Sequence, residues 1–343
     1  MSNGQRRVTL GHGAGGKLTQ ELITTLFVPH LKNDMLMEMG DSAFIRGKPL
    51  KDKLAFTTDS FVVTPLFFPG GDIGKLAVNG TINDLVVAGA KPLYLSAGFI
   101  LEEGLGFGDL EKICASMSAA CRDGDVSIVA ADTKVVEKGK ADRIFINTSG
   151  VGLIHPKADI DPKRVRPGDR IILTGTLGDH GVSVFLARHD LGIATDVKSD
   201  CAPLTSLLLP PIEKFGGDVH FMRDLTRGGF GTILNEMASQ SKASVVVEEE
   251  SLPVLPGVTA VCEMLGFDPL YLANEGKAML AVDPGIADDV LKQLRRNKLG
   301  KNATIVGTAE KADNGGARVY MKTSVGGTRL VDMLLEDQLP RIC

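Results

Sequence analysis

The 343-residue sequence lacks the features that mark several common classes of protein. Its 38 lysines and arginines are outnumbered by 42 acidic residues, so it has no basic excess for binding nucleic acid. Its first residues lack the apolar core of a signal peptide, and no apolar run is long enough to cross a membrane. We therefore expect a cytoplasmic protein that binds neither nucleic acid nor a membrane.

The five cysteines are not arranged for metal binding. None forms a CxxC pair, and no histidine stands at the spacing of a zinc site. An odd number of cysteines in a chain without an export signal indicates reduced thiols. Cys343 differs from the other four because it is the last residue, where burial is least expected. It does not belong to a prenylation box, which needs its cysteine four positions from the end. On the residues alone, a functional thiol and an accidental terminal cysteine are both open.

The length is about twice that of a typical single domain, so we expect two domains. The polar segment HPKADIDPKRVRPGD contains three prolines and no apolar periodicity, which is typical of a boundary. We therefore predict an α/β (α+β) fold with a first domain over 1–155, a second over 156–335, and a mobile tail over 336–343 that carries Cys343.

Apolar spacing predicts the main elements of both halves. The second half alternates strands and helices and ends in a helix-like segment, TRLVDMLL. In the first half we expect helices over 17–27, 70–89 and 108–122 and a pair of strands over 43–45 and 54–58. The middle helix contains Gly74 and Gly80, which indicates close packing of its backbone, and a polar stripe that includes Asn83.

Two groups of residues are candidates for binding a nucleotide. The loop GHGAGGKL precedes a helix, and the backbone N–H groups of such a loop can wrap phosphate oxygens, although a flexible loop explains it equally well. Its candidate residues are Gly13, Gly15, Gly16 and Lys17. Four aspartates lie at strand ends or beside a helix; singly they are turn or cap residues, but together they suit Mg²⁺, which prefers carboxylate oxygens. They are Asp41, Asp59, Asp84 and Asp132.

Two glycine turns, GTLGDHG and RDLTRGGF, each precede a predicted helix whose first turn could bind an anion, although most such turns bind nothing. His180 lies in the first of them. A general base and a structural histidine are both compatible with its position.

Taken together, these segments resemble the HypE-type hydrogenase maturation factors, the carbamoyl dehydratases. The resemblance covers nearly the whole chain and includes TTDSFVVTPLFFPGGDIGKLAVNGTINDLVVAG, DTKVVEKGK, GDHG, RDLTRGGF, ANEGK and the terminal LPRIC. The terminal motif is the most specific, because it separates this family from related aminoimidazole ribonucleotide and selenophosphate synthetases. Ala14 and Ala131 depart from the family pattern without removing a functional group.

The resemblance implies two α/β domains, a homodimer, and ATP with Mg²⁺. It implies that a partner carbamoyltransferase loads Cys343, that the chain dehydrates the S-carbamoyl group to a thiocyanate, and that an iron-carrying scaffold complex receives the cyanide. It also makes Lys134 and Glu275 candidates for proton removal and Asn83 and Thr133 candidates for nucleotide contacts. For both Lys134 and Glu275, an ordinary surface ion pair is the alternative. The alternatives are a selenophosphate-synthetase-like kinase, although the first cysteine is Cys114, and a non-catalytic thiol carrier.

Overall fold

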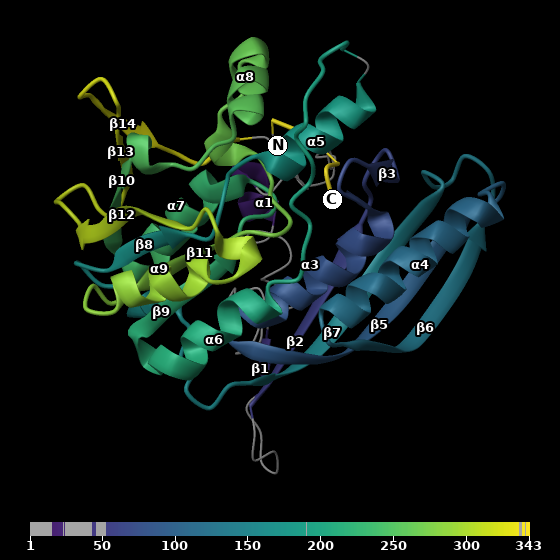
Figure 1. Cartoon of the computed structure of the whole chain (residues 1–343), viewed down its shortest axis with the longest axis horizontal. Helices are drawn as coiled ribbons and strands as arrows, with labels where there is room; N and C mark the ends of the chain where they lie inside the picture. The colour runs from purple at the N-terminus through teal and green to yellow at the C-terminus, as the bar shows by residue number, and fades with distance from the viewer. Residues whose placement is uncertain are drawn as a thin grey trace, which may run out of the picture.

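The computed structural model describes residues 16–22, 24, 43–45, 53–189, 191–335, 338–339 and 341–343. These residues form a five-stranded sheet, a seven-stranded sheet and a small two-stranded sheet, with flanking helices, which confirms the predicted α/β class (Figure 1). Among them, no helix combines the length and the apolar composition needed to cross a membrane. Gly13, Gly15 and Asp41, which were candidate ligands, lie outside the described residues.

The first half builds a five-stranded sheet in the order β1-β2-β7-β5-β6. All neighbours are antiparallel except β5 and β6, which are parallel and joined by helix α4. The predicted strand pair over 43–45 and 54–58 is confirmed as β1 and β2. The elements of this half are α1 (Lys17–Leu22), β1 (Ala43–Ile45), β2 (Leu54–Phe61), β3 (Phe67–Phe68), β4 (Gly71–Asp72), α3 (Ile73–Val87), β5 (Ala90–Glu102), α4 (Phe107–Asp123), β6 (Ser127–Val136) and β7 (Ile144–Ile154).

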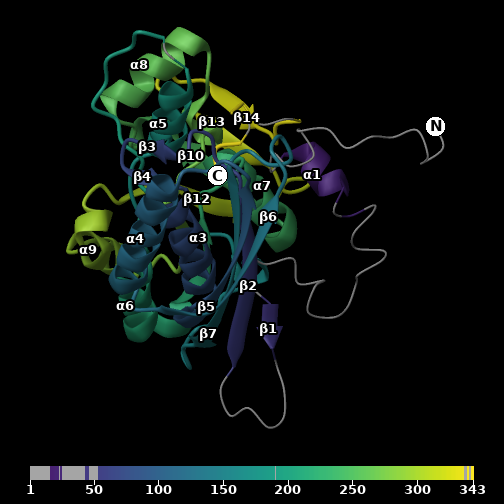
Figure 2. The same cartoon turned by 90° about the vertical axis from the view of Figure 1, so that its right-hand side faces the viewer.

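Helix α3 is buried along almost its whole length. Asp72 caps it by accepting hydrogen bonds from the backbone N–H groups of Gly74 and Lys75 at 2.8 and 3.1 Å. A Cβ on Gly80 would lie 2.8 Å from the ring of Phe61, so the expected close approach of the helix backbone is confirmed. Figure 2 shows α3 and α4 together on one side of the sheet.

The second half builds a seven-stranded sheet in the order β14-β13-β10-β12-β8-β11-β9. Between Ile154, where β7 ends, and Arg170, where β8 begins, the chain adds no strand and forms one short 3-10 helix. The elements of this half are η5 (Pro162–Arg164), β8 (Arg170–Leu173), α5 (Asp179–Arg188), α6 (Thr205–Phe215), η6 (Gly216–Asp218), β9 (Val219–Asp224), α7 (Gly229–Ser241), β10 (Ala243–Glu248), η7 (Glu249–Ser251), α8 (Pro256–Leu265), η8 (Pro269–Tyr271), β11 (Ala278–Val282), α9 (Ala287–Arg295), η9 (Lys298–Gly300), β12 (Thr304–Lys311), β13 (Val319–Lys322) and β14 (Thr328–Val331).

The helix predicted for TRLVDMLL is wrong. Residues Thr328–Val331 form β14, which pairs antiparallel with β13. The two strands are joined by a tight turn in which Gly326 has a φ of 85°, a conformation that favours glycine. The hairpin gives the short apolar segment backbone partners that an isolated helical turn of this length would lack.

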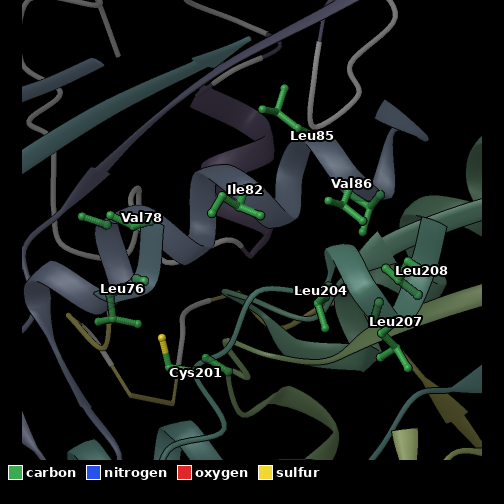
Figure 3. Close-up of a cluster of buried hydrophobic side chains, with 14 of the residues drawn as sticks. Leu76, Val78, Ile82, Leu85, Val86, Cys201, Leu204, Leu207 and Leu208 are labelled. Atoms are coloured by element: carbon green, nitrogen blue, oxygen red, sulfur yellow. The ribbon is translucent and has the colours of Figure 1, made fainter. Parts of the chain in front are cut away.

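The two halves share one hydrophobic core along α3. Figure 3 shows Leu76 and Ile82 of α3 on the side that faces Cys201, Leu204 and Leu207 from the second half. The boundary between the halves is therefore a packed seam, lined on one side by α3 and on the other by the segment that leads into α6. This seam positions the polar groups that follow.

Candidate functional site

Asn83 of α3 holds the second half in place at the seam. Its side-chain oxygen accepts from the backbone N–H of Leu204 at 2.8 Å, and its side-chain amide donates to the carbonyls of Ala202 and Glu275 at 3.1 and 3.3 Å. Asn83 is 1% exposed, so these bonds satisfy a buried amide. Asn83, the candidate nucleotide contact, therefore fixes the backbone of Glu275, the candidate for proton removal.

Glu275 is buried in the loop between η8 and β11. Its own N–H and that of Gly276 both donate to the carboxylate of Asp200 at 3.1 Å, so Asp200 anchors the backbone of this loop. Its side-chain Oε1 is buried and has no hydrogen-bond partner among the residues that the structure describes. Burial, followed by the negative charges of Asp224, Asp59 and Asp200, raises the pKa of Glu275 well above its ordinary value. An ionised Glu275 is consequently a stronger proton acceptor than an ordinary carboxylate.

Asp59 and Asp84 lie where β2 meets α3. Burial raises the pKa of Asp59, although the guanidinium of Arg227 and a hydrogen bond from the Ser60 N–H oppose this shift. Asp84 accepts a hydrogen bond from the hydroxyl of Thr57 at 2.8 Å. Carboxylates of both halves, Asp59 of the first and Glu275 of the second among them, therefore lie near one another at the seam. Their mutual repulsion favours the binding of a cation there.

The charge of this group fits the predicted Mg²⁺, but the described residues contain no cluster of three acidic or other ligating side chains that could chelate an ion. Magnesium usually takes one or two carboxylates and completes its shell with waters and substrate phosphates. The unpartnered Oε1 of Glu275 and the raised pKa of Asp59 are therefore compatible with a cation that arrives together with a nucleotide.

Asp132, Thr133 and Lys134 lie on β6, at the sheet edge remote from β2. The ammonium of Lys134 is 2.7 Å from the carboxylate of Asp132, and the side chains are 69% and 72% exposed. Hydrogen bonds from Lys134 and Thr133 lower the pKa of Asp132. Three strand spacings separate β6 from β2, about 14 Å in total. Within one chain, these residues are thus not brought together with Asp59.

The glycine loop is described only from Gly16 onward. A Cβ on Gly16 would lie 2.4 Å from the carbonyl oxygen of Leu334, and the N–H of Lys17 donates to that same carbonyl at 2.8 Å. This N–H is therefore already occupied by the segment that leads to the C-terminal tail. The side chain of Lys17 is exposed.

The end of the chain is packed against both halves. Ile342 and Leu339 are buried, and Cys343 is half-buried, so the expectation that burial would be least here is wrong for the docked tail. His180 of α5 lies 3.1 Å from the carbonyl of Ile342, and Arg188 of the same helix donates to the carbonyl of Arg341. The guanidinium of Arg341 pairs with Asp142 of the first half.

Some of these groups carried no signal in the sequence. Asp200 lies in a segment without periodicity, yet it holds the Glu275 loop and forms an ion pair with Lys277 at 3.7 Å. Asp224 and Arg227 fall within RDLTRGGF, so that motif did indicate them as a group, but as the start of a helix rather than as neighbours of Glu275.

Two family models describe AIR synthase related proteins, and their N-terminal and C-terminal domains match residues 39–154 and 166–320. These matches, which fall on the two large sheets in turn, place the fold in the AIR synthase related class. Across 98% of the chain, the sequence is 48% identical to a carbamoyl dehydratase HypE from Bradyrhizobium diazoefficiens, of which it covers 96%. The chain belongs to the carbamoyl dehydratase HypE family.

Solved structures give the same answer. The chain is similar to a hydrogenase maturation protein HypE in complex with ATP, with a TM-score of 0.82, 44% identity, and coverage of 98% of this chain and 100% of that one. It is also similar to a chain of a HypE–HypF complex, with a TM-score of 0.86, 43% identity, and coverage of 91% and 99%.

Proposed function

We propose that the chain uses ATP to dehydrate an S-carbamoyl group on Cys343 to a thiocyanate, which supplies the cyanide ligands of a nickel–iron hydrogenase. The observation that carries this proposal is the position of the tail. Ser199, which binds the histidine that holds the tail, is adjacent to Asp200, which holds Glu275. One short segment therefore connects the carrier of the substrate to a buried proton acceptor.

The chemistry takes place in two steps at the carbamoyl group. The carbamoyl oxygen attacks the γ-phosphorus of ATP, ADP leaves, and one N–H proton is lost to give a C=N bond. Loss of the second N–H proton then expels phosphate as the C–O bond breaks, which leaves S–C≡N. Glu275 accepts a proton at its Oε1, because this atom is buried, basic and has no partner within the described residues.

The carboxylates Asp59 and Asp84 would hold Mg²⁺ on the phosphates of ATP, together with Asp132 of the partner subunit. The ion would neutralise phosphate charge. The chain's own groups position it through two contacts. The Thr57 hydroxyl orients Asp84, and Arg227 offsets the negative charge of Asp59.

A homodimer would bring the remaining candidates to the seam. The face of the first sheet opposite α3 exposes Phe56, Tyr94 and Ile100 at 41%, 54% and 44%. Phe56 and Tyr94 both pair with Val151 of β7, so they lie on the same face. Exposed apolar side chains grouped on one face are typical of an interface. A second copy on this face would place Lys134 of the partner subunit at the seam, where it would stabilise charge on the leaving phosphate.

Two other partners complete the proposal. A HypF-type carbamoyltransferase loads the thiol, in keeping with the similarity to a chain from a HypE–HypF complex. An iron-carrying scaffold complex accepts the cyanide. Both partners need the thiol outside the seam, so the tail has to leave the docked position between steps.

Intact-mass spectrometry tests the proposal directly. Incubation with the carbamoyl donor enzyme should add one carbamoyl group, and ATP should then remove one water. Cys343→Ala should show neither change, whereas Cys114→Ala, which removes another accessible thiol, should show both. Thiocyanate on any other cysteine in the Cys343→Ala protein would refute the assignment.

A further inference from the structure

His180 is a fully buried histidine whose two ring nitrogens are both engaged. Nδ1 lies 2.8 Å from the hydroxyl of Ser199, and Nε2 lies 3.1 Å from the carbonyl of Ile342. A carbonyl can only accept, so Nε2 carries the hydrogen, and Nδ1 accepts from the Ser199 hydroxyl. That hydroxyl in turn accepts from the N–H of Cys201 at 3.2 Å. This chain of bonds defines a neutral imidazole in one tautomer.

The surroundings of the ring keep it in this state. Burial is the main cause that lowers the pKa of His180, opposed by the charge of Asp200 and the bond to Ile342. Phe68 of the first half packs edge-on against the ring, with centroids 5.5 Å apart. Neither nitrogen is left to take a proton from a substrate, so the bonding does not fit a general base.

We propose that His180 is a positioning residue that holds the C-terminal tail by the backbone carbonyl of Ile342 and so sets where the Cys343 thiol is presented. Its purpose rests on the proposed function, but the docking itself can be measured without any reaction. Arg188, two turns further along α5, holds the preceding carbonyl of Arg341. The helix therefore binds two successive peptide groups rather than side chains that are specific to the tail.

The side chains of the tail complete the fit. Leu339 approaches Gly181 of α5, where a Cβ would lie 3.5 Å from Leu339 Cδ1, and Ile342 belongs to the shared core. Arg341 has a φ of 58°, which is unfavourable for a residue with a Cβ, and it reaches Asp142. Because two carbonyls are bound in sequence, a tail shifted by one residue would present its thiol in the wrong place.

The test measures the reactivity of the Cys343 thiol in the full-length protein, without ATP or partner. A Cys114→Ser background removes the exposed competing cysteine, and a bulky maleimide reports release of the tail by mass spectrometry. His180→Phe keeps a planar aromatic ring but loses the donor, so the reaction should accelerate roughly fivefold, as expected for loss of one hydrogen bond. Wild-type reactivity in this variant would overturn the proposal.

Rescue and control variants separate positioning from general loosening. Gln at position 180 can place an N–H near the site of Nε2, so His180→Gln should react slowly, like the wild type, while the shorter His180→Asn should react like His180→Phe. Ser183→Ala removes a hydrogen bond from α5 to the carbonyl of Pro69 without touching the tail, and should leave the rate unchanged. If Ser183→Ala released the tail as fast as His180→Phe, or if the Gln and Asn variants reacted at equal rates, the faster reaction would come from a loosened seam. The hydrogen bond to Ile342 would then not be its cause.

The buried thiols of Cys201 and Cys262 report folding in the same spectra, because both stay unmodified while the seam is closed. The experiment is also independent of the proposed function. A wild-type protein whose tail is held by His180 but that forms no thiocyanate would contradict only the dehydratase assignment. If His180→Gln docks the tail and still dehydrates it, a role as the base is excluded; if it docks without dehydrating, the histidine does more than position the tail, and the proposal fails.

Discussion

The two large sheets of this chain differ in how well their strands are covered. In the second sheet every residue of β11 is buried, because the strand has neighbours on both edges and cover on both faces. In the first sheet β6 is an edge strand that is exposed along almost its whole length, with Val129 and Val135 at 62% and 69%. Exposed apolar edges are normally covered or blocked. This exposed edge is where the proposed second copy would add cover to the first half.

The candidate chemistry is divided along the same line. Glu275 stands just before the buried β11, in a loop fixed by Asp200 and Asn83. Lys134 and Asp132 stand on the exposed β6 and pair with each other. An exposed ion pair of this kind contributes little to stability, so its residues could exchange partners at little cost in the proposed dimer.

The largest effect should come from a charge on the exposed face of the first sheet. Ile100→Glu places a carboxylate where the second copy would bury an apolar side chain, so the dimer and all dehydration should be lost. Analytical ultracentrifugation and the mass assay measure the two losses. Phe107→Glu is the matched control, because Phe107 is 89% exposed at the start of α4, on the other side of the sheet. A dimeric, active Ile100→Glu protein would show that this face is not the interface.

A smaller but more specific effect is expected from mixing two inactive proteins. Glu275→Gln should accept the carbamoyl group and stall, and Lys134→Ala should also be inactive. If each site combines Glu275 of one subunit with Lys134 of the partner subunit, exchange of subunits leaves one intact site in every mixed dimer. The mixture should then recover about a quarter of wild-type turnover. No recovery after confirmed subunit exchange would place both residues in the same subunit's site.

Local patterns predicted much of the fold. The turn between residues 45 and 54 indicated the β1–β2 pair, and Gly74 and Gly80 indicated a closely packed α3. TRLVDMLL failed because its helix-like spacing competed with a glycine turn, and pairing with β13 decided the outcome.

Local patterns in the sequence predicted the site less well than they predicted the fold. Glu275 was singled out only through family resemblance, and the role of Cys343 stayed open until that resemblance was added to its terminal position. Asp200 and Arg188 come from segments far away in sequence, and tertiary packing alone brings them to Glu275 and to the tail. The separation of Asp132 from Asp59 follows from strand order, which four similar aspartates in a sequence do not reveal.

The smallest effect concerns a buried acid in the completed half. Asp179 begins α5, and its carboxylate accepts from the hydroxyl of Thr176 at 2.5 Å. Burial, then the negative charge of Asp200, raises its pKa from 3.8 to about 6. The folded state therefore binds this proton more tightly than the unfolded state does. The stability that it contributes is complete below pH 3.8 and is lost as the pH rises through about 6.

Asp179→Asn should remove this dependence. The difference in unfolding free energy between variant and wild type should change by about 3 kcal/mol between about pH 4 and about pH 7, in favour of the variant at the higher pH. Urea unfolding at a series of pH values measures it. Thr176→Val provides an opposite control: its hydroxyl lowers the pKa of Asp179, so its loss should extend the decline to higher pH. If Asp179→Asn kept the wild-type slope, the acid responsible would lie elsewhere at the seam, with Glu275 the first to examine because its pKa is also raised.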